Sequence, residues 1–372
     1  MSDVRPVLPF LTVVDPASNH RSQIVGALAN FYRVNDFADG ANALRVLRAK
    51  QPDLILVDDL TPPQGGYEFV RQVRLDHTPG LAEVPIIVTS KLEEPELQTA
   101  VRQCGANGYL IKPYRYSALM KAVTTQINSQ VEALWDELPP KQRTALRGTL
   151  DVFLSLSEII ETGTKFEYAA MRTACEPLVE VIAENDFRAL LNGVRSHDNY
   201  TYAHSLKVAT MLCLFGSALG LNAQEQVLLA CGGLLHDTGK MLIPHAVLNK
   251  PGKLDSSEWD VMRSHVPVTL DFLQASVSIP KGAIIIAAQH HEKLDGSGYP
   301  QGLAGSQLNY LARMAAIVDV FSALTDRRVY KAGMSVADAL ALMTGPMATH
   351  LDQHLLRLFK ELVLDTTGGE LT

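Results

Sequence analysis

The 372-residue sequence has little cysteine, no excess of basic residues and no long apolar run. Its four cysteines form no Cys-x-x-Cys pair, so we predict neither a zinc knuckle nor a disulfide framework and expect a reducing compartment. The longest apolar stretch, about residues 208–221, is too short to cross a bilayer. Residues 1–10 lack the charged start and apolar run of a signal peptide. We therefore expect a cytoplasmic protein without membrane insertion.

The net formal charge is −7 and the pI is near 5.9. A general nucleic-acid-binding protein usually carries a basic stripe, so we expect no nucleic-acid partner, although a local basic pocket for phosphates stays compatible with this charge. A hydrophobic content of 47% is ample for packed cores. At about 150 residues per domain, the chain should form two or more domains.

Short apolar runs alternate with amphipathic segments in residues 1–130, which we predict to be the first domain. The five strand candidates are Pro9–Val14, Phe31–Val34, Leu54–Val57, Val84–Val88 and Gly108–Ile111. Segments 21–29, 42–49 and 94–103 suit helices. The alternation predicts an α/β domain with a doubly wound, five-stranded parallel sheet.

Polar residues follow the strand candidates at the sheet edge where ligands of such sheets bind. They are Asp15, Asp58, Thr89 and Lys112. This set, together with the proline after Lys112 and the run 58–68, resembles a response-regulator receiver domain. The resemblance implies that Asp58 accepts a phosphoryl group, with Thr89 sensing it and Lys112 pairing with it. It also implies Mg²⁺ at this site and a sensor histidine kinase as partner.

One departure concerns the residue after Asp15, where the receiver family usually places a second acid and this chain has Pro16. Magnesium needs oxygen ligands, which a proline side chain does not supply. Two alternatives stay open. Either Asp58 is phosphorylated with one carboxylate fewer, or the domain serves for docking or for forming a homodimer.

Residues 131–190 read as helical connectors and as the entry to a second domain. Pro139 and Pro140 interrupt the helical pattern after Trp135. Apolar residues recur at helical spacing in residues 150–160, which predicts a packed stripe. Residues 191–372 also show helical periodicity and no sustained alternation, so we expect an all-α bundle there.

Histidine is concentrated in one region, because seven of the 11 histidines lie between residues 197 and 291. His236 precedes Asp237, and His290 precedes His291 and a glycine-punctuated loop that ends at Pro300. A single histidine is more often structural than a metal ligand. Adjacent pairs reverse that expectation, since burying so many unpaired polar rings would be costly.

Several separate motifs resemble the HD-GYP family of metal-dependent phosphodiesterases, over roughly residues 183–340. They are Tyr200-Thr201 with His204-Ser205, the run 236–240 (HDTGK), the run 248–254 (LNKPGKL), His265, the run 290–300 (HHEKLDGSGYP), and Asp319 followed by Arg328, Tyr330 and Lys331. The resemblance implies two divalent ions, iron or manganese. Its ligands fall on His204, His236, Asp237, His265, His290, His291 and Asp319.

The same resemblance implies roles in catalysis and in substrate binding. It assigns catalysis to Asp237 and Lys240, and substrate contacts to Lys240, Arg328, Lys331 and Tyr299. The alternative for the basic residues is a solvated surface. In the family the Gly-Tyr-Pro loop is also linked to GGDEF-domain proteins, so such a protein is an expected partner.

Four departures from the family pattern bear on the site. Tyr200 stands where some members place a glutamate ligand for a third metal, so we predict two ions, with Glu292 or Asp198 as replacements if a third binds. Ser322 stands where an acid is common, and Val329 where proline is common. His197 and His245 match no ligand position and are predicted to be structural or surface residues.

The implied function is hydrolysis of cyclic di-GMP to pGpG, or further to GMP, in two-component signalling. One alternative is an HD phosphohydrolase that acts on another nucleotide, including mixed cyclic dinucleotides. The other is a cyclic-dinucleotide sensor or docking protein with weak or lost activity.

Overall fold

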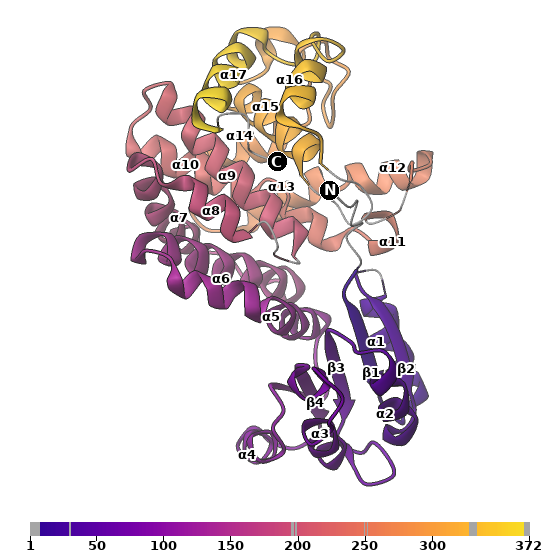
Figure 1. Ribbon diagram of the computed structural model, residues 1–372. Coiled ribbons are helices and arrows are strands. Elements are labelled where there is room, and N and C mark those ends of the chain that lie inside the picture. Colours follow the sequence, from indigo (N-terminus) through magenta and orange to yellow (C-terminus); the bar gives the residue numbers. More distant parts are fainter. Residues whose placement is uncertain are drawn as a thin grey trace. The chain divides into compact units, whose positions relative to one another are not determined.

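The computed structural model describes residues 8–29, 31–194, 197, 199–248, 250, 252–326 and 333–367, except the side chains of His245, Thr366 and Thr367. The chain divides into two compact units with their boundary between residues 130 and 131, inside helix α5. Strands and helices build the first unit and helices the second (Figure 1). The first unit has a hydrophobic cluster on each face of its sheet, and the second unit has one of its own. No helix in the described ranges is both long and apolar enough to span a membrane.

The first unit alternates strands and helices. In chain order they are β1 (Phe10–Val14), α1 (Ser18–Leu28), β2 (Arg33–Phe37), α2 (Gly40–Ala49), β3 (Leu54–Asp58), α3 (Gly66–Arg74), η1 (Leu81–Glu83), β4 (Ile86–Ser90), α4 (Glu94–Cys104), β5 (Gly108–Ile111) and α5 (Tyr116–Leu134). The strands form one parallel sheet in the order β2-β1-β3-β4-β5. The predicted five-stranded parallel sheet is confirmed.

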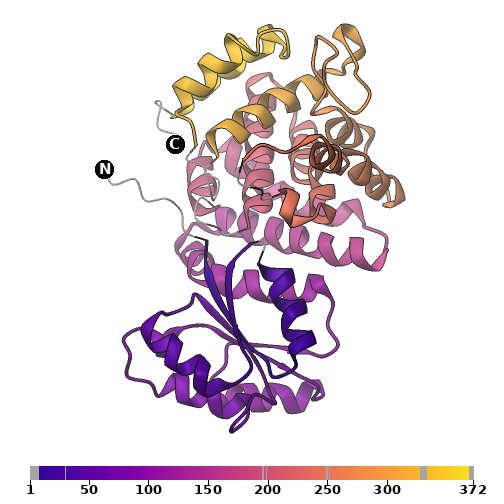
Figure 2. The ribbon, with the colours of Figure 1, turned by 90° about the vertical axis from the view of Figure 1, so that its right-hand side faces the viewer.

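Both faces of this sheet are covered, as Figure 2 shows. Ile55 and Val57 on β3 pack with α2, α3 and α4, whereas Leu54 and Leu56 pack with α1 and α5. Successive side chains of a strand point to opposite faces, so a strand covered on both sides is expected to be mostly apolar. The central strands are mostly apolar, with Thr12, Asp58 and Thr89 among their buried polar exceptions, which explains why apolar runs marked them in the sequence.

The second strand was predicted wrongly at Phe31–Val34. The observed strand β2 (Arg33–Phe37) has the sequence RVNDF, and none of its residues is fully buried. It lies at the edge of the sheet. An edge strand has fewer neighbours to cover it, so hydrophobicity marked the buried Tyr32 before the strand rather than the strand itself.

The second unit is helical, as predicted. Its elements are η2 (Trp135–Glu137), α6 (Pro140–Thr162), α7 (Tyr168–Ala183), α8 (Phe187–Val194), α9 (Tyr200–Ala218), α10 (Ala223–Leu235), η3 (Thr238–Leu242), α11 (His245–Leu248), α12 (Ser256–Arg263), α13 (His265–Ala275), α14 (Lys281–Gln289), η4 (Gly305–Gln307), α15 (Tyr310–Thr325), α16 (Val336–Thr344) and α17 (Gln353–Thr367). The expected break falls before Pro140, which begins α6.

Helix α9 runs through the interior of this unit, because every residue from Val208 to Gly216 is buried. A helix that is apolar on all sides must be surrounded by others, and α7, α10 and α15 pack against it. Asn222 and Glu225 form a capping box that starts α10, and Asp255 and Glu258 form another at α12. These caps fix where the two helices begin.

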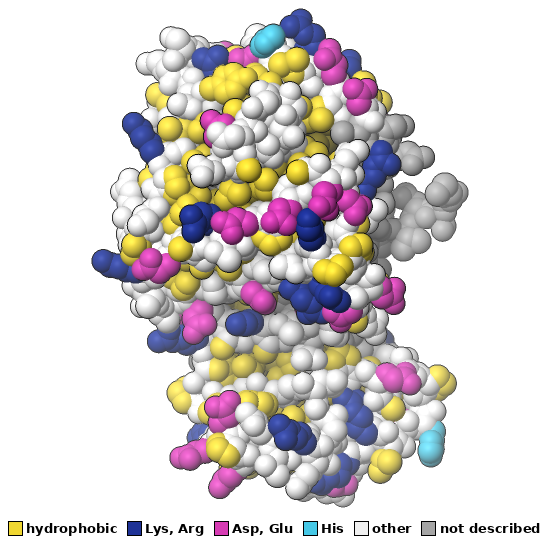
Figure 3. Space-filling model, turned by 90° about the vertical axis from the view of Figure 1, so that its left-hand side faces the viewer, with side chains coloured by type: hydrophobic (Ala, Val, Ile, Leu, Met, Phe, Trp, Pro, Cys, Tyr) yellow, Lys and Arg dark blue, Asp and Glu magenta, His cyan; other side chains and the backbone are white. Residues whose placement is uncertain are grey.

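Charged residues are mixed on the face that Figure 3 shows. Lysine and arginine side chains there stand among aspartate and glutamate side chains rather than gathering by sign. This distribution agrees with the net charge of −7 and gives that face no basic stripe.

Candidate functional site

The seven predicted metal ligands come from helices far apart in the sequence and meet in the interior of the second unit. They are His204 on α9, His236 and Asp237 after α10, His265 at the start of α13, His290 and His291 after α14, and Asp319 on α15. Their ligand atoms form two groups. One holds Asp237, His265, His290 and His291, the other holds His204, His236 and Asp319, and within each group the atoms lie within 4.8 Å of one another.

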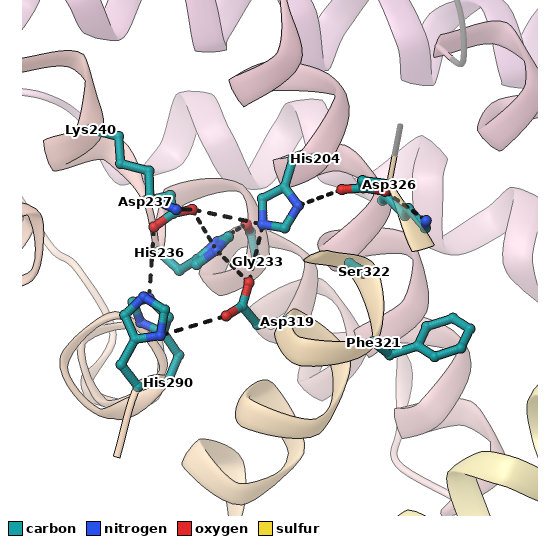
Figure 4. Close-up of polar contacts among 12 residues, drawn as sticks. His204, Gly233, His236, Asp237, Lys240, His290, Asp319, Phe321, Ser322 and Asp326 are labelled. Atoms are coloured by element: carbon teal, nitrogen blue, oxygen red, sulfur yellow. Dashed lines mark hydrogen bonds and ion pairs between the residues drawn. The ribbon is translucent and has the colours of Figure 1, made fainter. Parts of the chain in front are cut away.

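The carboxylate of Asp237 lies between the two groups (Figure 4). Its Oδ2 is 3.2 Å from Nε2 of His236 and 3.7 Å from Nε2 of His204. Its Oδ1 is 3.3 Å from Nε2 of His265 and 3.7 Å from Nε2 of His290. One carboxylate therefore presents a different oxygen to each group.

Asp319 has a similar arrangement. Its Oδ1 is 3.1 Å from Nε2 of His204 and 3.7 Å from Nε2 of His236, while its Oδ2 is 3.7 Å from Nδ1 of His291. Asp319 is buried, and His291 is the most exposed of the seven ligands, with 22% of its side chain accessible. The arrangement therefore opens on the side of His291.

Three of the histidines use Nδ1 in the same way, against the backbone carbonyl oxygen three residues earlier. The pairs are His236 with Gly233 at 2.7 Å, His265 with Met262 at 2.7 Å, and His290 with Ala287 at 2.9 Å. A carbonyl oxygen only accepts, so Nδ1 carries the proton in each ring. In the neutral ring Nε2 is then left with its lone pair facing the site.

Buried polar atoms without partners supply the fit test for a cation. Nε2 of His236, His265 and His290 and Oδ1 of Asp237 are buried and have no hydrogen-bond partner among the described residues. Such atoms are rare in folded proteins and costly unless something binds them. Imidazole nitrogens with carboxylate oxygens are ligands for divalent transition metals, so this donor set fits divalent metal ions.

Charge and burial act against each other on these groups. Burial raises the pKa of Asp237, but His236 and Lys240 outweigh that effect and hold it well below its usual range. Burial lowers the pKa of His236, but Asp237 and Asp319 outweigh that effect and raise it to about 10. Burial lowers the pKa of His265 to about 4. Asp237 is therefore ionised and His265 neutral near pH 7, the forms in which each binds a metal, whereas His236 must lose the second proton that Asp237 and Asp319 favour before its Nε2 can bind one.

Lys240 lies one turn after Asp237 in η3, and its Nζ is 2.5 Å from Asp237 Oδ2. The close packing of η3 on α13 depends on Gly239, because a Cβ there would lie 2.1 Å from the backbone oxygen of His265. The backbone N–H of Gly239 donates to Oγ1 of Thr269, 2.8 Å away. This approach brings the His-Asp pair next to His265.

Tyr299 of the predicted loop lies over the histidines. Its ring centroid is 4.7 Å from that of His291 and 6.4 Å from that of His265. The loop is held by Glu292, whose carboxylate accepts backbone N–H groups of residues 301 and 303 at 2.7 and 3.0 Å. Both oxygens of Glu292 accept hydrogen bonds from the loop, and its role as a replacement ligand for a third metal stays a prediction. Gly298 permits this close packing, since a Cβ there would lie 2.5 Å from Cα of Glu292.

Two residues beside Tyr299 escaped the sequence analysis. The Arg263 guanidinium lies 5.9 Å from the ring centroid of Trp259 and 6.0 Å from that of Tyr299. The Trp259 side chain is exposed. Their spacing of four residues on one helix was the available signal, because residues at i and i+4 share a face. Together the three side chains form a cationic and aromatic wall next to His265 and His291.

The sequence analysis also missed a carboxylate and a lysine near His204. Asp326 Oδ2 lies 2.7 Å from Nδ1 of His204, and its Oδ1 accepts from Nζ of Lys207 at 2.7 Å. Burial lowers the pKa of His204, but Asp319 and Asp326 outweigh that effect and raise it. Asp326 follows Asp319 by seven residues, two helical turns, which was the only sequence signal for it.

The remaining predicted residues divide into placed and unplaced ones. Tyr200 stacks on the ring of His204 with centroids 5.8 Å apart. His197 is buried and stacks on Trp135 at 5.9 Å, the structural role predicted for it. The predicted substrate ligands Arg328 and Lys331 lie outside the described residues, and so does Asp198, the alternative metal ligand. Val329 and the side chain of His245 also lie outside them.

The four predicted receiver residues meet at one edge of the sheet. Lys112 Nζ contacts the Asp58 carboxylate and lies 3.4 Å from Oδ2 of Asp15. Thr89 Oγ1 donates to Asp58 Oδ2 over 3.4 Å. Sequence analysis missed His20, whose Nδ1 lies 2.5 Å from Asp15 Oδ2. The two carboxylates of this pocket are thus paired with basic side chains of the chain itself.

Comparison with known proteins agrees with this architecture. Residues 11–124 match the response regulator receiver domain, and residues 186–355 match the HD domain. The cyclic di-GMP phosphodiesterase response regulator RpfG of Xanthomonas campestris pv. campestris (strain 8004) is 31% identical over 340 residues, covering 90% of this chain and 82% of its own length.

Two further matches each cover part of this chain. A 3'3'-cGAMP-specific phosphodiesterase 3 of Vibrio cholerae serotype O1 is 35% identical over 185 residues, covering 50% of this chain and 40% of its own length. The solved structure of Bd1817, an HDG"Y"P protein from Bdellovibrio bacteriovorus, superposes with a TM-score of 0.51 at 18% identity, covering 66% of this chain and 80% of that one. This last likeness shows the fold.

Proposed function

This chain belongs to the HD-GYP family, in the group that joins a receiver domain to the HD domain, and from that membership we propose that it hydrolyses cyclic di-GMP. RpfG, named as a cyclic di-GMP phosphodiesterase response regulator, matches most of both chains. The observation that carries the proposal is the set of buried Nε2 and Oδ atoms that converge without partners among the described residues. A metal-dependent hydrolase needs such atoms to hold its ions.

The proposed cofactor is a pair of divalent ions, iron or manganese. The two groups of ligand atoms and the position of Asp237 between them support two ions. Tyr200, where a third-metal ligand would stand, stacks on His204 with a phenol that is a poor metal ligand at neutral pH. When bound, the ions supply charge stabilisation to the phosphate and activation to the attacking water.

The residues of the chain that we propose to act on substrate surround the open side of the site. Lys240, 20% exposed and 2.5 Å from Asp237, is placed to hold a phosphate oxygen and to donate a proton to the leaving oxygen. Tyr299, Trp259 and Arg263 offer two aromatic rings and a guanidinium, groups that stack on a nucleobase. Arg328 and Lys331 are proposed phosphate contacts from the sequence alone.

The receiver pocket supports a proposed input by phosphorylation. Asp58 is buried at 5% exposure, contacts Lys112, and has Thr89 within reach, so we propose that it accepts a phosphoryl group from a kinase. Asp15 is the remaining carboxylate for Mg²⁺. Phosphorylation by acetyl phosphate, followed on an intact-mass spectrum against Asp58→Asn, distinguishes this input from a docking domain that is never phosphorylated.

The decisive experiment compares substrates. Protein purified without oxygen and loaded with iron or manganese is incubated with cyclic di-GMP, 3'3'-cGAMP and linear pGpG. We expect fastest loss of cyclic di-GMP, and the products identify pGpG or GMP as the end point. Preference for 3'3'-cGAMP is the second candidate, supported by the likeness of half of this chain to a phosphodiesterase named for that specificity. Inertness of the loaded protein toward all three would contradict the proposal and favour a sensor.

A GGDEF-domain partner for the loop around Tyr299 and a homodimer stay predictions. Both are accessible to one measurement, the mass of the assembly with and without such a partner in solution.

A further inference from the structure

His204 is held differently from the other histidines that turn Nε2 toward the site. His236, His265 and His290 each place Nδ1 against a backbone carbonyl of their own neighbourhood. Nδ1 of His204 instead lies 2.7 Å from a carboxylate oxygen of Asp326, 122 residues away in the sequence (Figure 4). The orientation of this ring therefore depends on a side chain from another helix.

Asp326 is itself held from α9, the helix that carries His204. Lys207, three residues after His204, donates from Nζ to the second oxygen of Asp326 at 2.7 Å and to Oγ1 of Thr325 at 2.9 Å. The side chains of His204, Asp326 and Lys207 are only 4%, 11% and 16% exposed. A buried carboxylate is costly unless paired, and Lys207 supplies the pair.

The other acids near His204 do not compete with Asp326 for Nδ1, because they lie on the opposite side of the ring. Asp319 and Asp237 lie 3.1 and 3.7 Å from Nε2 of His204, the nitrogen that faces the ligand group. Asp326 is the acid on the Nδ1 side among the described residues. Ser322, one turn earlier on α15, does not share this role, because its buried hydroxyl has no hydrogen-bond partner in the described part of the chain.

We propose that Asp326 is a positioning residue for the ion held by His204, His236 and Asp319, and that Lys207 acts through it. The carboxylate keeps the proton of His204 on Nδ1, so the lone pair of Nε2 stays directed at the ion. A charged acceptor also makes the imidazole a stronger donor to a metal than a backbone carbonyl does. The inference rests on the proposed two-ion function and adds which outer residues retain one of the ions.

The test measures metal retention in the full-length, metal-loaded protein, with Asp326→Ala, Asp326→Asn and the exposed control Asp271→Asn. After dialysis against a weak chelator, Asp326→Ala should fall from two ions per chain to one, with release of that ion roughly 10–100-fold faster. The Asn variant should lie between wild type and Ala, because its amide oxygen can still accept from Nδ1. Asp271→Asn should match wild type.

Lys207→Met and its combination with Asp326→Ala test the order of action. If Lys207 acts through Asp326, the double variant should release metal no faster than Asp326→Ala alone, a non-additive result. Additive effects would overturn the proposed order. Retention of both ions at the wild-type rate by Asp326→Ala would overturn the positioning role itself.

A purely structural tie between α9 and α15 predicts a different outcome. It would lower the thermal unfolding temperature of the metal-free variant and release both ions together, and that result also counts against the proposal. Metal retention needs no substrate, so it is independent of the proposed reaction. A wild type that holds two ions but cleaves no cyclic dinucleotide would defeat the proposed function while leaving the role of Asp326 intact.

Discussion

The receiver pocket and the metal centre both gather acidic side chains in a buried place, but they balance the charge differently. In the receiver pocket Lys112 contacts Asp58, and His20 and Lys112 approach Asp15, so the acids meet bases of the same chain. In the metal centre Lys240 meets only one oxygen of Asp237, and several imidazole nitrogens face inward without partners among the described residues.

This difference distinguishes a signalling pocket, whose occupancy changes, from a site that holds a resident cofactor. Acids already paired with a lysine gain little from a further cation, which suits a pocket whose occupancy changes with a signal. Lone pairs that converge from several helices stay costly until a cation binds, which suits a resident cofactor. Buried atoms without partners are thus a better guide to a metal site than acidic residues alone.

The largest expected effect comes from removing His236 and Asp237 together by alanine substitution. Asp237 presents an oxygen to both ligand groups, so the variant should lose bound metal and at least about a thousandfold in hydrolysis. Metal analysis, a product assay and far-ultraviolet circular dichroism should show lost metal, lost activity and retained helix. The control is His354→Ala, an exposed histidine on α17, which should behave as wild type. Activity that survives in the double variant would refute the assigned centre.

Removing divalent metal should destabilise the two units unequally. The helical unit should lose about 3 kcal/mol for each ion relative to protein saturated at a hundredfold the dissociation constant, and the receiver should change little. Hydrogen exchange after chelation, with Mg²⁺ kept present, should therefore rise in α9, α13 and α14 but not in β3 and β4. Equal loss of protection in both units would contradict the view that only the helical unit depends on a resident metal.

A smaller effect is expected at the aromatic wall. Trp259→Ala removes a ring that Arg263 covers, and the proposed stacking on a guanine base should be lost with it. KM for cyclic di-GMP should rise roughly tenfold while kcat stays within about twofold, and Trp259→Phe should restore most of the affinity. A fall in kcat at constant KM would show that Trp259 supports the metal centre instead.

The smallest effect concerns a receiver carboxylate satisfied by its own chain. Hydrogen bonds from Thr78, and then from Arg48, lower the pKa of Asp76 from 3.8 to about 2. A lowered folded-state pKa stabilises the fold above pH 3.8, and that contribution disappears as the pH falls toward 2. Urea unfolding should show a difference between wild type and Asp76→Asn at pH 5 that shrinks at pH 2.5. If the difference in the free energy of unfolding did not change with pH, the charge of the Asp76 carboxylate could not be its cause.

What the sequence could predict followed from local patterns. Residues 54–57 of β3 and 86–88 of β4 are apolar runs, and the pairs His236-Asp237 and His290-His291 marked residues whose atoms the fold brings together. Strand β2 was misplaced because an edge strand need not be apolar.

The supporting residues had no such local mark. Asp326 lies 122 residues from His204, and His20 lies 94 residues from Tyr114, whose hydroxyl contacts it at 3.0 Å. Contacts of that separation are set by how helices pack, and a single charged or imidazole side chain on a helix usually faces water. Only the folded chain distinguishes these side chains from solvated ones.

Asp237 would attach both proposed ions to one side chain. Its two oxygens, turned toward different ligand groups, are joined through one carbon atom, and covalent bonds hold their separation whatever the surrounding helices do. Small movements of α9 against α13 would shift the two ligand groups but leave the distance between the two oxygens of Asp237 unchanged. Both proposed ions would therefore stay attached to one rigid group when the surrounding helices move.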